Sequence, residues 1–448
     1  MSSNKSNIPP SPNIFKKSYY NLIPFRHRYG KGFNAFFKFL LQSSEWSEDK
    51  LKHYQNEEFL KLVKHCYKNV PYYQEKFAEY GIRQNSIQSI DDITKLPILN
   101  KENIRKNINK LQATNMNNNV KKYPFSTSGS TGEKLQFFGT DEVFKKEAAF
   151  ILRYFIQTGA EMYDKPSIWL RRYVPENSNS PLWYFDEELK RLYISAYHIN
   201  QETIFDYFKI FNSIEASTLV TYPSSAYILA KLAKKNNLSF KYINQIRVAS
   251  EKMQHSWAEE INNVFKIKPL AHYGQIEKVS FMHQTHESND YKYIYEYGVT
   301  ELHVDNNYQN KILGTGFLNY YMPFLRYDTG DYAESAHKEN PKIVTDILGR
   351  TSDLLISENG TLLPGVNFFS WIDKNIENIS LYQIIQNLDK TIEFHYVPDG
   401  IKIIDEKKII HGLQQRLGNL PVKVIVEKEI KRNIKTGKLK LIKNEIQI

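Results

Sequence analysis

The 448-residue chain contains a single cysteine, Cys66. One thiol cannot form an intrachain disulfide or supply a cysteine-rich zinc site, so both kinds of stabilisation are excluded. Long apolar stretches are also missing, and residues 1–15 are polar and hold three prolines instead of the apolar core of a signal peptide. We therefore expect a cytoplasmic protein without a transmembrane segment, and leave open a peripheral contact with a membrane.

Acidic residues are fewer than basic ones, 49 Asp and Glu against 60 Lys and Arg, which gives a formal net charge of +11. Such a balance attracts nucleic acid, anionic membranes or small polyanions such as ATP. The basic runs are short, at residues 231–235 and 428–440, and the remaining charge is spread along the chain. We therefore expect no specific nucleic-acid binding, while a basic nucleic-acid-binding protein remains an alternative from another functional class.

The first part of the chain is predicted to be helical. Apolar residues recur there at three- and four-residue spacing and form one face that Pro71 ends; they are Phe59, Val63, Cys66, Tyr67 and Val70. On this pattern Cys66 is a small core residue and not a nucleophile. Asn100 precedes a further helical stretch and is predicted to cap it.

From about residue 115 onward, short β-type runs alternate with helical ones. Residues 219–222 and 246–249 are predicted strands, and residues 227–235 between them are a predicted helix. This alternation favours an α/β fold with a partly parallel sheet. The last hundred residues instead indicate a small α+β unit, with a helix at 407–417 between strands at 392–396 and 422–426.

A chain of this length exceeds the size at which one hydrophobic core stops growing. We predict an N-terminal helical extension at residues 1–110. A large domain with mixed β-sheets and helices is predicted at 111–349, and a small C-terminal α+β lid domain at 350–448.

The most unusual local sequence begins at Ser126, where seven consecutive residues are Ser, Thr or Gly and a lysine follows shortly after. Glycines let backbone N–H groups approach an anion, hydroxyls add donors, and the lysine adds charge. The run therefore suggests a phosphate-binding loop made of Ser128, Gly129, Ser130, Thr131, Gly132 and Lys134. Its spacing is not that of a Walker loop, and a flexible polar loop is the alternative interpretation.

Four further short motifs follow this run in order. They are Tyr273-Gly274-Gln275-Ile276-Glu277, Arg326-Tyr327-Asp328-Thr329-Gly330-Asp331, Gly349-Arg350-Thr351-Ser352-Asp353 and Lys435-Thr436-Gly437-Lys438. Each is weak by itself. In this order and with these gaps, the chain resembles the adenylate-forming superfamily of acyl-CoA synthetases, and within it the phenylacetate-CoA ligase branch with the CapK-type proteins of polysaccharide gene clusters. The resemblance runs nearly from end to end and includes residues 69–73, 95–101, 221–224, 249–251 and 322–327.

The resemblance implies a role for each motif. The loop from Ser128 to Lys134 would cradle the phosphates of ATP, Tyr273 would lie against adenine, and Glu277 would be catalytic and bind Mg²⁺. Asp331 would hold the ribose hydroxyls and Arg350 the ribose or the α-phosphate. Lys438 would be the second catalytic residue, stabilising charge on the α-phosphate as the carboxylate attacks. The remaining nucleotide-binding candidates are Ser250, Glu251, Gly274 and Gln275.

Three segments depart from the family pattern. The phosphate loop of relatives often carries proline where this chain has Lys134. Ser352, with Asp353 behind it, stands where relatives carry an acidic residue or lysine at the hinge, and these two residues are the predicted hinge. Relatives often have a cysteine after the Glu277 motif that contributes to a zinc site, whereas this chain has His283 and His286. We interpret these imidazoles as core or surface side chains and not as metal ligands.

The resemblance predicts an ATP-dependent ligase that turns a carboxylic acid into an acyl-AMP and passes the acyl group to an acceptor. The acid is unidentified, and Trp169 and Trp183 are candidates for lining its pocket. The acceptor is a CoA thiol, a carrier protein, or an amine or hydroxyl of a sugar precursor in capsule or surface-polysaccharide synthesis. Transfer of AMP to a coenzyme, and a catalytically silent nucleotide-binding relative, are further alternatives.

Overall fold

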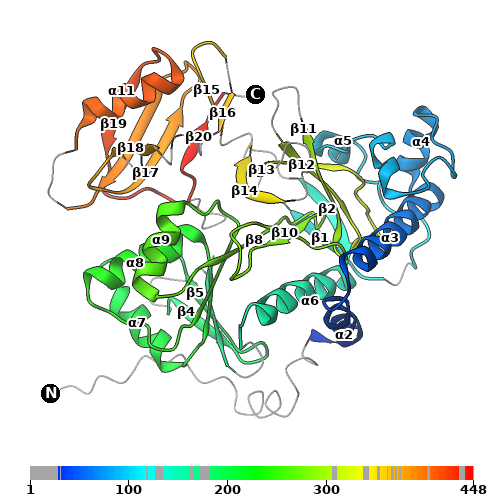
Figure 1. Ribbon diagram of the computed structural model, residues 1–448, viewed down its shortest axis with the longest axis horizontal. Coiled ribbons are helices and arrows are strands. Elements are labelled where there is room, and N and C mark those ends of the chain that lie inside the picture. The colour runs from blue at the N-terminus through cyan, green and yellow to red at the C-terminus, as the bar shows by residue number, and fades with distance from the viewer. Residues whose placement is uncertain are drawn as a thin grey trace.

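The computed structural model describes a chain of several sheets surrounded by helices (Figure 1). The described residues are 29–30, 32–117, 120–126, 135–161, 165–171, 173, 181–304, 310–335, 343–350, 354–360, 362–364, 368, 371–372, 375–400, 404–432 and 439–446. The phosphate-loop candidates at 128–134, the hinge candidates Ser352 and Asp353, and Lys438 therefore lie outside the described residues. Within the described part of the chain, no helix is long and apolar enough to cross a membrane.

Helices dominate the first part of the chain, as the apolar spacing predicts. They are α2 (Phe33–Ser43), α3 (Glu48–Asn69), α4 (Pro71–Glu79), the 3₁₀ helix η2 (Ile90–Lys95) and α5 (Lys101–Lys106). Cys66 is buried in α3, and burial raises the pKa of its thiol, which confirms its place in the core. Pro71 ends α3 and starts α4, where its missing N–H costs nothing. The Asn100 side chain accepts a hydrogen bond from the Asn103 N–H, 2.8 Å away, and so caps α5 as predicted.

The largest sheet has eight strands in the order β10-β9-β8-β7-β6-β3-β5-β4. The five central neighbours β8, β7, β6, β3 and β5 run parallel, and the outer strands are antiparallel. The strands are β3 (Ser167–Arg171), β4 (Trp183–Asp186), β5 (Arg191–Ser195), β6 (Thr218–Thr221), β7 (Gln245–Ala249), β8 (Leu270–Gly274), β9 (Phe281–His283) and β10 (Lys292–Tyr293). Its helices are α6 (Asp141–Gln157), α7 (Ile204–Ser213), α8 (Pro223–Lys235) and α9 (His255–Phe265). Both predicted strands and the predicted helix between them are confirmed, with α8 starting four residues earlier than expected.

Two smaller antiparallel units complete the large domain. The hairpin β1 (Lys122–Ser126) and β2 (Gln136–Thr140) pairs at Ser126 and Gln136, directly beside the Ser/Thr/Gly run. A four-stranded sheet has the order β11-β12-β13-β14, formed by Gly298–Val304, Asn310–Gly316, Tyr327–Ser335 and Val344–Arg350.

The C-terminal unit is a four-stranded sheet in the order β19-β18-β17-β20 with one helix, which confirms the predicted α+β pattern. Its elements are β17 (Ile379–Gln386), β18 (Ile392–Pro398), α11 (Glu406–Leu417), β19 (Val422–Val426) and β20 (Ile442–Asn444), and a short pair β15 (Leu354–Ile356) and β16 (Leu362–Pro364) lies beside it. It has a hydrophobic cluster of its own, which Trp257 of α9 joins from the large domain. In Figure 1 this unit lies over α8 and α9. The fold class is thus confirmed, while the domain boundary near residue 350 stays a prediction.

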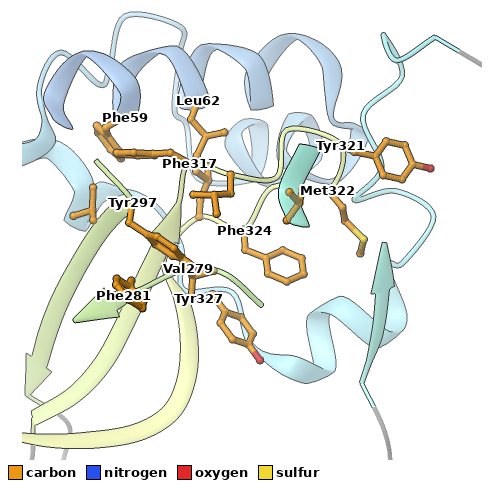
Figure 2. Packing of buried hydrophobic residues seen from close by; sticks show 14 of the residues in the cluster. Phe59, Leu62, Val279, Phe281, Tyr297, Phe317, Tyr321, Met322, Phe324 and Tyr327 are labelled. Atoms are coloured by element: carbon orange, nitrogen blue, oxygen red, sulfur yellow. The ribbon is translucent and has the colours of Figure 1, made fainter. Parts of the chain in front are cut away.

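The N-terminal helices hold the segment that leads into β13. The Tyr73 hydroxyl donates to the Pro323 carbonyl oxygen (3.1 Å) and accepts from the Leu325 N–H (2.9 Å). The Leu99 N–H donates to the Arg326 carbonyl oxygen, 3.1 Å away. Figure 2 shows the apolar side of this arrangement, in which Phe59 and Leu62 of α3 belong to the same buried cluster as Phe324 and Tyr327. Helices from the start of the chain therefore fix the backbone at Tyr327, more than 200 residues away in sequence.

Candidate active site

The motif residues converge at one edge of the large sheet. Parallel strands end at the same edge, and in open α/β sheets this carboxyl edge is where ligands bind. Arg171 ends β3, Ser250 directly follows β7, and Gly274 ends β8, so residues more than 100 positions apart meet there. The structure thus brings together the motifs around residues 250 and 274, which the sequence analysis had placed in one site only through the resemblance.

Glu277 lies in the turn between β8 and β9 and is 4% exposed. Its Oε1 accepts a hydrogen bond from the Tyr327 hydroxyl, 2.7 Å away. Its Oε2 is buried and has no hydrogen-bond partner among the described residues. A buried carboxylate oxygen without a partner is costly, so an unmatched one points to a ligand or to a functional role.

Close packing holds the Glu277 turn against the second sheet. At Gly316 of β12, an added Cβ would come within 2.1 Å of the Lys278 carbonyl oxygen and 2.9 Å of the Val279 Cα. Only glycine permits this approach. On the other side, the Lys278 ammonium pairs with Glu147 of α6 at 3.0 Å. These contacts fix the position of the Glu277 backbone, and the sequence motifs did not indicate them.

Tyr273 and Asp331 form a second buried pair. The Tyr273 hydroxyl donates to Asp331 Oδ2 at 2.8 Å and accepts from Gln275 Nε2 at 3.3 Å. Both side chains are less than a tenth exposed. Asp331 pairs in register with Arg350 across β13 and β14, which places the Arg350 backbone beside it, although nothing is described of the Arg350 side chain. The proposed contact of Tyr273 with adenine stays a prediction.

Strained backbone conformations cluster around the candidate site residues. Ser250, Lys278 and Arg326 each have a positive φ, of 75°, 57° and 46°, a region that side chains other than glycine seldom occupy. Ser250 precedes Glu251 and Lys278 follows Glu277, and both of these neighbours are candidate site residues. Arg326 precedes Tyr327, which is the hydrogen-bond partner of Glu277. Such strain persists where the surrounding structure enforces it, and it clusters at functional sites. A buried ion pair with Glu301, 2.9 Å away, holds Arg326 in its strained backbone conformation.

Arg171 lies at the same edge of the sheet but belongs to none of the sequence motifs. Its Nη1 donates to the Ser250 hydroxyl at 3.2 Å, and its guanidinium lies over the Tyr222 ring, 4.9 Å from the centroid. Burial, together with the Arg171 charge, lowers the pKa of nearby His272 to about 3, so this imidazole is neutral. The His272 Nδ1 atom is buried without a hydrogen-bond partner among the described residues. A signal was present in the sequence, because Arg171 is a charged residue that ends an apolar strand.

A cavity of about 150 Å³ lies between α6 and strands β3 and β5 of the large sheet. Apolar α6 side chains line it, together with Trp169 of β3, Arg191 and Tyr29. Phe155 lines the cavity and also contacts the His272 ring in the middle of β8, with centroids 6.1 Å apart, so one side chain links the cavity to a strand that leads to the carboxyl edge. Trp169 lines this cavity, whereas Trp183, on the edge strand β4, does not, and the role of either residue in binding the acid stays a prediction.

Glu251 is held by two backbone groups of the protein. Its Oε2 accepts from the Ser224 N–H at 3.1 Å, and its Oε1 accepts from the Leu439 N–H at 2.7 Å. Both oxygens are thus engaged with protein groups, one of them in the C-terminal unit. The expected contact of Glu251 with the nucleotide stays a prediction.

The two histidines after the Glu277 motif point to separate partners. Burial lowers the pKa of His283 to about 4, and its ring stacks on Tyr154 with centroids 4.3 Å apart. His286 Nε2 lies 2.9 Å from the Thr158 carbonyl oxygen. Among the described residues, no group of three or more His, Cys, Asp or Glu side chains is arranged to hold a metal. His283 is buried and His286 is exposed, so one is a core side chain and the other a surface side chain, as interpreted.

Comparison with known proteins places these features in context. No family model matches the chain. The chain is 24% identical over 402 residues to protein CapK of Staphylococcus aureus, covering 84% of this chain and 87% of that protein. It is also 36% identical over 61 residues, 14% of each chain, to a phenylacetate-coenzyme A ligase of Pseudomonas putida.

Among solved structures, 2-hydroxyisobutyryl-CoA ligase in its postadenylation state superposes with a TM-score of 0.63 at 14% identity, covering 87% of this chain and 88% of that one. The same ligase in its thioesterification state gives a TM-score of 0.54 at 15% identity, covering 90% and 91%. The chain therefore has the fold of these CoA ligases, and it is similar to CapK along most of its length.

Proposed function

We propose that this protein is an ATP-dependent adenylate-forming ligase. It would activate a carboxylic acid as an acyl-AMP, release pyrophosphate, and pass the acyl group to an acceptor. The observation that carries the proposal is the buried Glu277 carboxylate, which Tyr327 fixes by one oxygen while the other has no partner among the described residues. The similarity to CapK and the shared fold support the same reaction class.

The Glu277 oxygen fits Mg²⁺. This cation prefers oxygen ligands and is commonly held by one or two carboxylates together with substrate phosphates. Glu277 offers one anionic oxygen whose direction is set by the Tyr327 hydrogen bond. A cation there would neutralise the triphosphate as pyrophosphate leaves. A site of this kind needs no cluster of protein ligands, and Glu277 would supply its carboxylate.

The nucleotide would lie along the carboxyl edge of the sheet. Asp331, oriented by Tyr273, would accept hydrogen bonds from the ribose hydroxyls. The run from Ser128 to Lys134 would cradle the phosphates, because the paired strands β1 and β2 bring both of its ends to one place. Lys438 would act from the C-terminal unit on the α-phosphate, and Arg350 would contact the ribose or that phosphate. Ser352 and Asp353 would form the hinge.

The acid would lie between α6 and the sheet. Its tail would enter the cavity beside Trp169, and its polar end would lie toward Arg171, Ser250 and His272 at the carboxyl edge. The acceptor would be CoA or an amine or hydroxyl of a sugar precursor. The name of the CapK relative supports a role in surface-polysaccharide synthesis, and the solved relatives support CoA.

The test is ATP–pyrophosphate exchange with Mg²⁺ against aryl acetates, fatty acids, hydroxy acids, amino acids and sugar uronates. Exchange that requires one acid class, and that Glu277→Gln and Lys438→Ala each reduce by about 100-fold or more, supports the proposal. Lys438→Ala should impair adenylation far more than transfer from preformed acyl-AMP, and equal loss in both steps contradicts the assignment of Lys438.

ATP binding without exchange for any acid would favour the silent nucleotide-binding relative. Salt-dependent retention of nucleic acid, irrespective of nucleotide, would favour the nucleic-acid alternative.

A further inference from the structure

The C-terminal unit docks on the large domain at the start of α8. Arg432 Nη1 donates to the Ser224 hydroxyl at 3.0 Å, and the Leu439 N–H donates to Glu251 Oε1 at 2.7 Å. Ser224 and Glu251 are themselves joined, because the Ser224 N–H donates to Glu251 Oε2 at 3.1 Å. Two points of the C-terminal chain thus meet one pair of residues in the large domain.

Glu251 is well suited to hold a backbone N–H. Ser224 is the second residue of α8, and its N–H is one of the donors that the first helical turn leaves without an intrahelical partner. The carboxylate is therefore fixed by the positive end of the helix through one oxygen and presents the other to Leu439. Hydrogen bonds to an ionised acceptor are about twice as strong as neutral ones.

Leu439 in turn belongs firmly to the C-terminal unit. It lies in the hydrophobic cluster of that unit and is 7% exposed. The next residues join its sheet, since Gln383 Nε2 donates to the Lys440 carbonyl oxygen at 2.5 Å and the Ile384 N–H donates to the Leu441 carbonyl oxygen at 2.7 Å. A hydrogen bond at Leu439 therefore acts on the whole C-terminal sheet.

Arg432 and Leu439 enclose residues 433–438, the last of which is Lys438. We propose that Glu251 is a positioning residue that fixes the C-terminal unit, through the Leu439 backbone, against the carboxyl edge of the large sheet for adenylate formation. The role in adenylate formation rests on the proposed function, but the anchor at Leu439 does not.

The docking itself does not depend on Glu251. Tyr227 of α8 stacks on Trp257 of α9, with ring centroids 5.3 Å apart, and both pack into the C-terminal cluster. A surface ion pair between Lys231 and Asp399 also joins the two units. Removing the Glu251 carboxylate should therefore loosen the chain at Leu439 while the domains stay folded and in contact.

Hydrogen exchange tests the anchor without any activity. Glu251→Ala should raise exchange of the Leu439 amide by about 10- to 100-fold, the factor expected for the loss of a hydrogen bond to a charged group. Lys231→Ala, which breaks the ion pair with Asp399 between the same two units, is the matched control and should leave this amide unchanged. Equal protection of Leu439 in wild type and Glu251→Ala, or equal loss in both variants, overturns the proposal.

Pyrophosphate exchange then tests the role in positioning. Glu251→Ala should lower kcat with little change in the KM for ATP, and Ser224→Ala, which removes the acceptor of Arg432, should act in the same direction more weakly. A raised KM for ATP with an unchanged kcat would instead make Glu251 a nucleotide contact and overturn the positioning role. If wild type shows no exchange with any acid, the proposed function fails while the Leu439 amide still decides whether Glu251 anchors the chain.

Discussion

The hydrogen bond between Tyr327 and Glu277 gives the sharpest test of the site. Tyr327→Phe removes one oxygen atom from a side chain that is 0% exposed. The Phe ring keeps the packing against Phe324, whose centroid lies 5.4 Å away. Glu277, which is 4% exposed and already has one oxygen without a partner among the described residues, then loses the partner of its other oxygen.

Two separate effects follow from this substitution. Leaving a buried charged acceptor unsatisfied should cost about 2–3 kcal/mol of unfolding free energy. The carboxylate also loses the group that sets its direction, and removal of such a supporting partner lowers metal affinity by about 10- to 100-fold. The half-saturating Mg²⁺ concentration for pyrophosphate exchange should therefore rise by about that factor.

Tyr207→Phe provides the matched control. Tyr207 is also 0% exposed, and its hydroxyl donates to the Ser195 carbonyl oxygen at 2.5 Å, so this substitution likewise leaves a buried acceptor without its donor. Thermal unfolding and Mg²⁺ titration of both variants separate stability from metal binding. The reasoning is refuted if Tyr327→Phe loses stability but keeps the Mg²⁺ dependence of wild type, because Tyr327 would then act on the fold alone.

Three further outcomes are expected. Gly316→Ala places a Cβ 2.1 Å from the Lys278 carbonyl oxygen, so the Glu277 turn must move by about 1 Å and exchange should fall by about 100-fold; near wild-type exchange in a folded variant would contradict this. Burial lowers the pKa of His283 from 6.5 to about 4, so the unfolded chain takes up a proton first as pH falls, and stability should drop by about 3 kcal/mol between pH 6.5 and 4. Denaturant unfolding of His283→Phe should show a flatter pH dependence, and an unchanged slope would rule out this imidazole as the cause. Ala148→Leu narrows the cavity beside Trp169 and should reduce kcat/KM for acids with bulky tails by about tenfold relative to small ones, whereas unchanged acid selectivity would place the acid elsewhere.

The sequence by itself determined the local elements and the order of the motifs. The apolar spacing around Cys66, the proline at position 71 and the cap at Asn100 predicted helices that the structure contains, because each depends on residues within one or two turns. The alternation of strands and helices likewise predicted the α/β class, and the ordered motifs predicted the resemblance to adenylate-forming ligases.

Only the tertiary structure decided how the site residues are held. Glu277 and its hydrogen-bond partner Tyr327 are 50 residues apart, and Glu251 and Leu439 are 188 apart. No periodicity or local spacing encodes such pairs, since they form only when separate sheets and domains dock. The same docking brings the Leu439 N–H to Glu251, because a carboxylate accepts whichever N–H groups the packed structure brings to it.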